Sequence, residues 1–134
     1  MHYNVMWKIE YEYIKDWLAE LDAPTRDCVT AAVEVLAHLG PALGRPLVDV
    51  VVASRHANMK ELRPPSPGAT EFRILFAFDP DRSAVLLLGG DKSGMNSKKA
   101  AKRDRWSKWY KKAVAEADRR YDEHLAILQR KGRD

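Results

Sequence analysis

Apolar residues recur every three or four positions in two stretches near the N-terminus, the spacing of one face of an α-helix. The first stripe consists of Tyr11, Ile14, Leu18 and Leu21, and the second of Val29, Val33 and Leu36. Residues 22–24 separate the stripes, because a proline is accepted in the first turn of a helix but not in its interior. Gly40 and Pro41 end the second stripe. The pattern therefore predicts two N-terminal helices that pack as an antiparallel hairpin.

Short runs of β-branched and aromatic residues surround this hairpin and predict strands. One run precedes it at residues 3–9, and four follow it at residues 47–53, 58–63, 70–78 and 84–88. Residues 64–68 hold three prolines and a glycine, so they predict a loop, and residues 79–81 predict a turn. The last three runs are therefore expected to form an antiparallel meander. Because the hairpin precedes these strands, the pattern predicts an α+β fold with a small, mostly antiparallel twisted sheet.

A long helix is predicted from residue 98 towards the C-terminus, because apolar residues again share one stripe. That stripe consists of Trp106, Trp109, Ala113, Ala117, Tyr121, His124 and Leu128. Residues 1–91 hold 9 Lys and Arg against 13 Asp and Glu, a net charge of −4, whereas residues 92–134 hold 14 against 6, a net charge of +8. This basic C-terminal extension suits a polyanionic partner such as nucleic acid, although a solvated helix would carry the same pattern.

The length of 134 residues fits a single domain with one core. No apolar run reaches the ~18 residues of a membrane span, and the first residues lack the pattern of a secretory signal, so we expect a cytoplasmic protein without a membrane partner. The single Cys28 excludes an internal disulfide. The four histidines lack metal-ligand spacing, and the motifs of nucleotide-binding and acyl-enzyme sites are absent. We therefore expect neither a metal nor a cofactor.

Three cations stand close to the predicted meander. Arg63 and Arg73 lie on either side of the proline-rich loop, and Lys92 follows the last strand. If the two arginines share a face of the sheet, they either pair with Glu61 and Glu71 in a structural ladder or clamp a phosphate. Two further candidates, His56 and Lys60, precede the loop. A histidine at the surface is usually only a surface residue, but it is also the side chain best suited to exchange a proton near neutral pH.

The order of these motifs resembles that of the RelE/ParE toxin superfamily, and the HigB-like branch of bacterial and phage type II toxin–antitoxin systems in particular. The resemblance rests on "MKELRP", "TEFRILFAF", "GGDKSG" and the tail "KWYKKAVAEADRRYDEHLAIL", in this order behind a helical hairpin, and it covers most of residues 1–134. It implies a single toxin domain with a cognate helix-turn-helix antitoxin. It also implies a metal-independent endoribonuclease that cuts messenger RNA on the ribosome, through attack of the RNA's own 2′-hydroxyl.

The resemblance implies roles for particular residues. Arg63 would stabilise transition-state charge, Arg73 would hold an adjacent phosphate, and Lys92 or His56 would transfer a proton. This chain has Ser93-Gly94-Met95 where the family often has a second cation and a Tyr or His, which leaves the general base open. RNA contacts are expected from Lys60, Lys98, Lys99, Lys102, Arg103 and Arg105.

Two other functions fit the same sequence. The ParE branch of the superfamily acts on a protein target, DNA gyrase, and for such a toxin Arg63 would be dispensable. A basic RNA-binding module without catalysis would bind RNA and never cut it.

Overall fold

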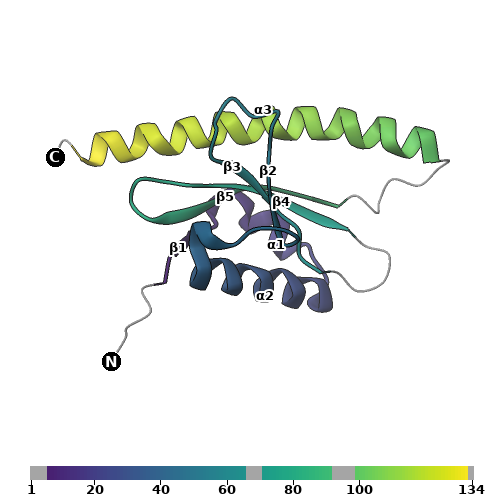
Figure 1. The fold of residues 1–134 in the computed structure, drawn as a ribbon, viewed down its shortest axis with the longest axis horizontal. Helices are drawn as coiled ribbons and strands as arrows, with labels where there is room; N and C mark the ends of the chain where they lie inside the picture. Colours follow the sequence, from purple (N-terminus) through teal and green to yellow (C-terminus); the bar gives the residue numbers. More distant parts are fainter. Residues whose placement is uncertain (1–5, 66–70, 92–98, 133–134) are drawn as a thin grey trace.

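The structure, a computed structural model, describes residues 6–65, 71–91 and 99–132, and it describes only the backbone for residues 99–106. A five-stranded sheet forms the centre of the molecule, with α2 on one face and α3 on the other (Figure 1). The strands are β1 (Lys8–Glu10), β2 (Val48–Val50), β3 (Met59–Leu62), β4 (Phe72–Phe78) and β5 (Ser83–Asp91). The helices are η1 (Glu12–Ile14), α1 (Lys15–Ala19), α2 (Ala23–Leu39), η2 (Gly40–Ala42) and α3 (Lys99–Lys131). The predicted α+β class is confirmed.

The sheet has the strand order β1-β5-β4-β3-β2. Strands β3 to β5 form the predicted antiparallel meander, β2 adds to it by antiparallel pairing with β3, and β1 pairs with β5 in parallel. The predicted first strand at residues 3–9 is shifted, because pairing begins at Lys8 opposite Ser83. Residues 3–5 lie outside the described residues.

Two N-terminal helices are present, but the first is much shorter than predicted. A 3₁₀ turn and the five-residue helix α1 replace a helix over residues 11–21. Arg26 donates hydrogen bonds to the carbonyl oxygens of Leu18, Ala19 and Leu21 and so caps the end of this segment. The Asp22 carboxylate accepts the N–H of Thr25 at 2.8 Å and starts α2.

Two cores lie on opposite faces of the sheet. Ile74 and Phe76 of β4 pack towards α2, whereas Leu75 and Ala77 pack towards α3. Because side chains alternate along a strand, Arg73 faces α3 as well. Both faces of β4 are therefore covered, which explains its nearly continuous apolar run.

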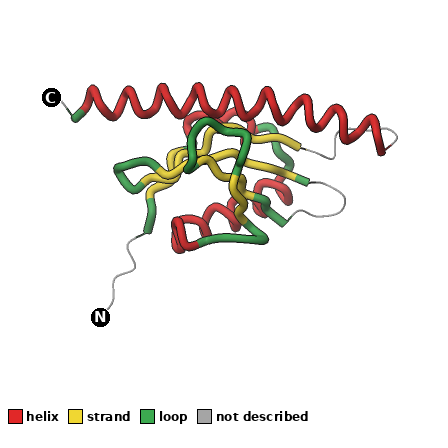
Figure 2. Tube along the Cα trace, turned by 45° about the horizontal axis from the view of Figure 1, so that its top comes forward, coloured by secondary structure: helices red, strands yellow, loops and turns green. Residues whose placement is uncertain are grey.

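The long helix α3 extends beyond the sheet, and the loop between β2 and β3 lies alongside it (Figure 2). Ala113, Ala117 and Tyr121 of the predicted stripe are buried, and the two small alanines let the helix approach the sheet closely. Polar contacts fix its second half: Tyr121 donates to the carbonyl of Phe78 at 2.7 Å, and His124 lies 2.7 Å from the Asp79 carboxylate. Ser54 also donates to the buried Asp118.

Candidate functional site

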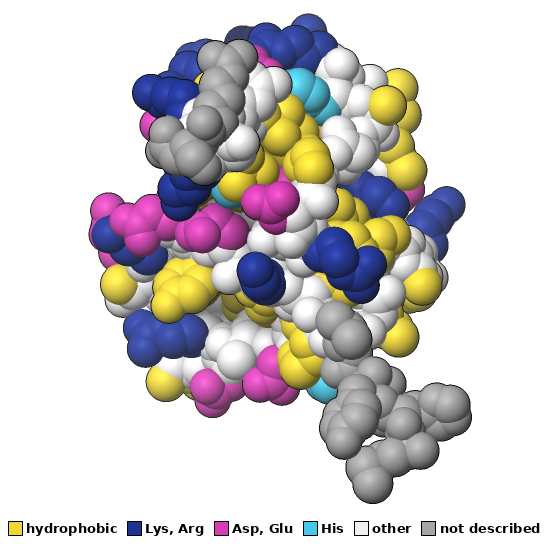
Figure 3. Space-filling view, turned by 90° about the vertical axis from the view of Figure 1, so that its left-hand side faces the viewer, with side chains coloured by type: hydrophobic (Ala, Val, Ile, Leu, Met, Phe, Trp, Pro, Cys, Tyr) yellow, Lys and Arg dark blue, Asp and Glu magenta, His cyan; other side chains and the backbone are white. Residues whose placement is uncertain are grey.

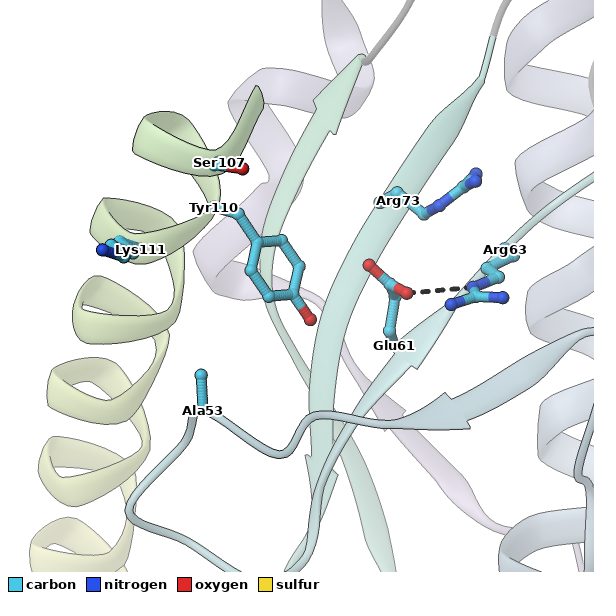
Figure 4. Close-up of a pocket in the computed structure, with 7 residues that line it drawn as sticks. All are labelled: Ala53, Glu61, Arg63, Arg73, Ser107, Tyr110 and Lys111. Carbon is cyan, nitrogen blue, oxygen red and sulfur yellow. Dashed lines mark hydrogen bonds and ion pairs between the residues drawn. The ribbon is translucent and has the colours of Figure 1, made fainter. Parts of the chain in front are cut away.

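A cavity of about 540 Å³ lies between residues 107–111 of α3 and the face of the sheet that α3 covers. Figure 4 shows the side chains that line it. They are Ala53, Glu61, Arg63, Arg73, Ser107, Tyr110 and Lys111. The cavity therefore brings together three parts of the chain. They are the β2–β3 loop, the residues on both sides of the proline-rich loop, and the C-terminal helix.

Strand register brings the two arginines together. Leu62 of β3 pairs with Ile74 of β4, so continuing the register by one residue sets Arg63 opposite Arg73. The Arg63 N–H donates to the carbonyl of Leu47 at 2.8 Å, which keeps Arg63 in line with the strand. Directly opposed residues point to the same face of a sheet. A register slip of one residue would turn one arginine away from the other.

Arg63 is held by two carboxylates. Its Nε donates to Glu61 at 2.9 Å, and its Nη2 lies 3.4 Å from Asp49. Asp49 pairs directly with Glu61 across β2 and β3, so the guanidinium lies beside two like charges and offsets their repulsion. The Glu61 side chain is only 6% exposed and depends on this cation, whereas the Arg63 side chain remains 34% exposed. Arg63 is thus ion-paired and cavity-facing at once.

Arg73 has a different environment. Its Nη1 donates to the carbonyl of Phe72 at 2.9 Å. It pairs across the sheet with Gly90 of β5. A Cβ on Gly90 would lie 2.1 Å from the Trp109 ring, so the indole rests directly on the glycine backbone. This contact sets the approach of α3 and, with it, the place of the next residue, Tyr110.

The Tyr110 phenol points from α3 towards Glu61 (Figure 4). Burial raises the pKa of Tyr110 to about 12, and the Glu61 and Asp49 carboxylates add to the rise, while Arg63 and Arg73 partly offset it. The phenol therefore stays protonated at neutral pH.

The cavity is suited to an anion. Among the lining residues that the structure describes, three are cations, Arg63, Arg73 and Lys111, and one is a carboxylate, Glu61. A second polar hollow, of about 390 Å³, lies beside the C-terminal half of α3, and five of its lining residues carry carboxylates: Glu10, Glu12, Asp79, Asp81 and Glu123. Figure 3 shows the end of the molecule where α3 terminates, with acidic and basic side chains side by side. A phosphate would be attracted to the first cavity and repelled by the second.

The other predicted site residues do not join Arg63 and Arg73 among the described cavity residues. His56 lies 2.7 Å from Asp122 of α3 and edge-on to Tyr121, and it does not line the cavity. Lys60 pairs with Phe76, so it lies on the α2 face of the sheet, over the Phe78 ring. Lys92 and Lys98 lie outside the described residues. For Lys99, Lys102, Arg103 and Arg105 the structure describes the helical backbone alone.

Sequence reasoning missed the contribution of α3. Ser107, Tyr110 and Lys111 are spaced as i, i+3 and i+4, which places them on one side of the helix. This polar strip beside the predicted apolar stripe was the available signal. Asp49 was also missed, since its position opposite Glu61 depends on the register of β2.

Within the described residues, no group of three or more His, Cys, Asp or Glu side chains is arranged to hold a metal ion. Among the helices in the same part of the chain, none has the length and apolar character to cross a membrane.

Comparison with known proteins places the cavity inside a matched region. The family described as "Phage derived protein Gp49-like" matches residues 16–122. Two relatives from Mycobacterium tuberculosis strain H37Rv bear the names "Putative toxin HigB2" and "Putative toxin HigB3". The first is 50% identical over 126 residues, which cover 94% of this chain and 58% of the relative, so the chain spans little more than half of that protein. The second is 44% identical over 113 residues, 84% of this chain and 88% of the relative.

Proposed function

Because the chain belongs to the Gp49-like family of phage-derived proteins, we propose that it is the toxin of a type II toxin–antitoxin system and cuts messenger RNA on the ribosome. The names of the two relatives support the assignment as a toxin. The cavity that joins Arg63, Arg73 and Lys111 supports the nuclease, and it is the observation on which this proposal rests.

The reaction that fits this cavity needs no metal. The 2′-oxygen of the RNA attacks the neighbouring phosphorus, the bond from phosphorus to the 5′-oxygen breaks, and a 2′,3′-cyclic phosphate remains. The phosphodiester passes from one negative charge to two at the pentavalent stage. Guanidinium groups stabilise that added charge, because their planar N–H donors match phosphate oxygens. Arg63 and Arg73 take this role in the proposal.

Two protons must move. A base takes the proton of the 2′-hydroxyl, and an acid supplies one to the departing 5′-oxygen. Glu61 is a carboxylate in the cavity and is able to accept a proton, and Tyr110 is a protonated phenol able to donate one. Lys92 stays a candidate for either step, because it follows the strand whose Gly90 pairs with Arg73. His56, held by Asp122 outside the cavity, is a weaker candidate.

The ribosome is, in this proposal, the polyanionic partner that the positive net charge of residues 92–134 suits. In this proposal Lys98, Lys99, Lys102, Arg103 and Arg105 contact ribosomal RNA, together with the exposed Lys108, Lys111 and Lys112. Binding through phosphates releases counterions, so affinity should fall steeply as salt rises. The cognate partner is an antitoxin with a DNA-binding helix-turn-helix. Both proteins act in the cytoplasm, where ribosomes are found.

Induction of the protein in growing cells, followed by mapping of messenger 5′ ends, tests this function. We expect new 5′ ends within translated codons in the wild type and none in Arg73→Ala. Growth arrest with intact messages would overturn the nuclease and leave a toxin with a protein target. If cells that lack the antitoxin continue to grow after induction, the proposal that the protein is a toxin is wrong.

A further inference from the structure

Asp49 lies next to the cavity without lining it. It belongs to the edge strand β2 and faces α3, because it pairs with Glu61 across the sheet. Its carboxylate oxygen Oδ2 lies 3.4 Å from Arg63 Nη2 and 3.8 Å from Arg45 Nε. The Asp49 side chain is 30% exposed, whereas that of Arg45 is 77% exposed. The contact to Arg63 is therefore the shorter and the better shielded of the two.

Glu61 and Asp49 contact different nitrogens of the Arg63 guanidinium, Glu61 by a hydrogen bond and Asp49 by an ion pair. Glu61 binds Nε, and this single contact leaves the group free to tilt. A second contact at Nη2 fixes the plane, since the five N–H donors of a guanidinium have a rigid arrangement. Among the contacts of the described residues, Nη1 of Arg63 is not engaged by either carboxylate. The two carboxylates thus leave N–H donors of Arg63 for an anion in the cavity.

A carboxylate at this place works against the binding of an anion, because it lowers the positive potential of the cavity. It benefits catalysis only if the orientation of Arg63 matters more than its charge. Interactions that act in the transition state raise the rate, while interactions that act equally on the bound substrate raise affinity alone.

We propose that Asp49 is a positioning residue that holds the Arg63 guanidinium in the orientation needed by the scissile phosphate. This inference rests on the proposed function of the cavity and adds a residue to it. Asp49 itself does not touch the RNA.

The variant Asp49→Asn tests this role, because it keeps the shape of the side chain and removes its charge. With programmed ribosomes as substrate, we expect kcat to fall about tenfold, since misplacement of a catalytic group is costly. We expect KM to fall roughly twofold at the same time, because a negative charge leaves the anion site. Asp27→Asn is the matched control: it removes the same charge from an exposed position on α2 and should change neither constant. An unchanged or higher kcat in Asp49→Asn would overturn the inference.

A second measurement does not depend on catalysis. Rotation about the Nε–Cζ bond of Arg63 exchanges Nη1 and Nη2, and NMR of the guanidinium nitrogens reports its rate. We expect rotation to be several-fold faster in Asp49→Asn than in the wild type or Asp27→Asn. Equal rates would overturn the inference even if the wild type cuts RNA, so the proposed function would survive. A wild type that does not cut RNA would overturn the function and the catalytic role of Asp49 together, whatever the NMR rates.

Discussion

Removal of the Arg63 side chain should affect folding as well as activity, and the two effects can be separated. In Arg63→Ala the Glu61 carboxylate, whose side chain is 6% exposed, loses the cation 2.9 Å away. Breaking a fully buried pair costs about 3–5 kcal/mol, and the partial exposure of Arg63 screens part of this, so we expect a loss of about 2–3 kcal/mol. In a domain of this size that corresponds to a Tm lower by roughly 6–15 °C.

Equilibrium unfolding in urea, followed by the fluorescence of the four tryptophans, measures this loss as a shift of midpoint at constant slope. The double variant Glu61→Gln/Arg63→Ala should recover at least half of the lost free energy, because a neutral amide needs no counter-charge. It should still fail to cut RNA. The control is Arg45→Ala, which removes an exposed cation 3.8 Å from Asp49 and should cost less than about 0.5 kcal/mol.

Two results would refute this reasoning. If Arg63→Ala is as stable as the wild type, the Arg63–Glu61 pair is not the buried contact described here. If the folded double variant cuts messenger RNA at the wild-type rate, the cavity is not the active site.

Three further predictions concern the surroundings of the cavity. Gly90→Ala should lower the free energy of unfolding by about 1–3 kcal/mol and slow cleavage, because the new Cβ would overlap the Trp109 ring. Gly44→Ala is the control, because its Cβ would meet nothing within 4 Å. Equal urea midpoints for the two variants would contradict this account. His56→Gln should leave kcat within about threefold of the wild type, because His56 is bound to Asp122 outside the cavity. Loss of a general base lowers kcat about 10²–10⁴-fold, so a decrease of that size would show that His56 is catalytic. Between pH 10 and 12 stability should fall with rising pH, since the unfolded chain loses the Tyr110 proton that the folded chain keeps. In Tyr110→Phe this fall should shrink by about 1 kcal/mol, after allowance for partial exposure. An identical alkaline profile by circular dichroism would argue against a raised pKa of Tyr110.

The sequence predicted the strands of the meander because their apolar runs are bounded by prolines, glycines and short turns. The resemblance to HigB-like toxins, based on motif order, is likewise confirmed. The parallel pairing of β1 with β5 was not predictable from local pattern, because it joins residues more than 70 positions apart. The shortness of α1 was missed for a related reason. Its apolar spacing is helical, but the Arg26 side chain binds the carbonyl oxygens at its end, a contact that local spacing does not reveal.

The site was only half predictable. Arg63 and Arg73 stood out as cations on either side of one loop, but whether they share a face depends on a register that a single residue could invert. Tyr110 and Lys111 could be placed only once α3 was seen to cross the sheet above Gly90. His56 and Lys60 are close to Arg63 in sequence but not in the cavity. Alternation along β3 and the contact to Asp122 place them elsewhere.

Cleavage of messenger RNA by the purified protein on programmed ribosomes tests the central claim most directly. The measurement compares the wild type with Arg73→Ala, which removes the hydrogen bond from Arg73 to the Phe72 carbonyl and should stay folded. Ribosome binding is checked for both, and the 3′ ends of the products are analysed. We predict cuts that end in a 2′,3′-cyclic phosphate for the wild type and no cuts for Arg73→Ala at equal ribosome binding. An intact message with the wild type, or equal cutting by Arg73→Ala, would contradict the account.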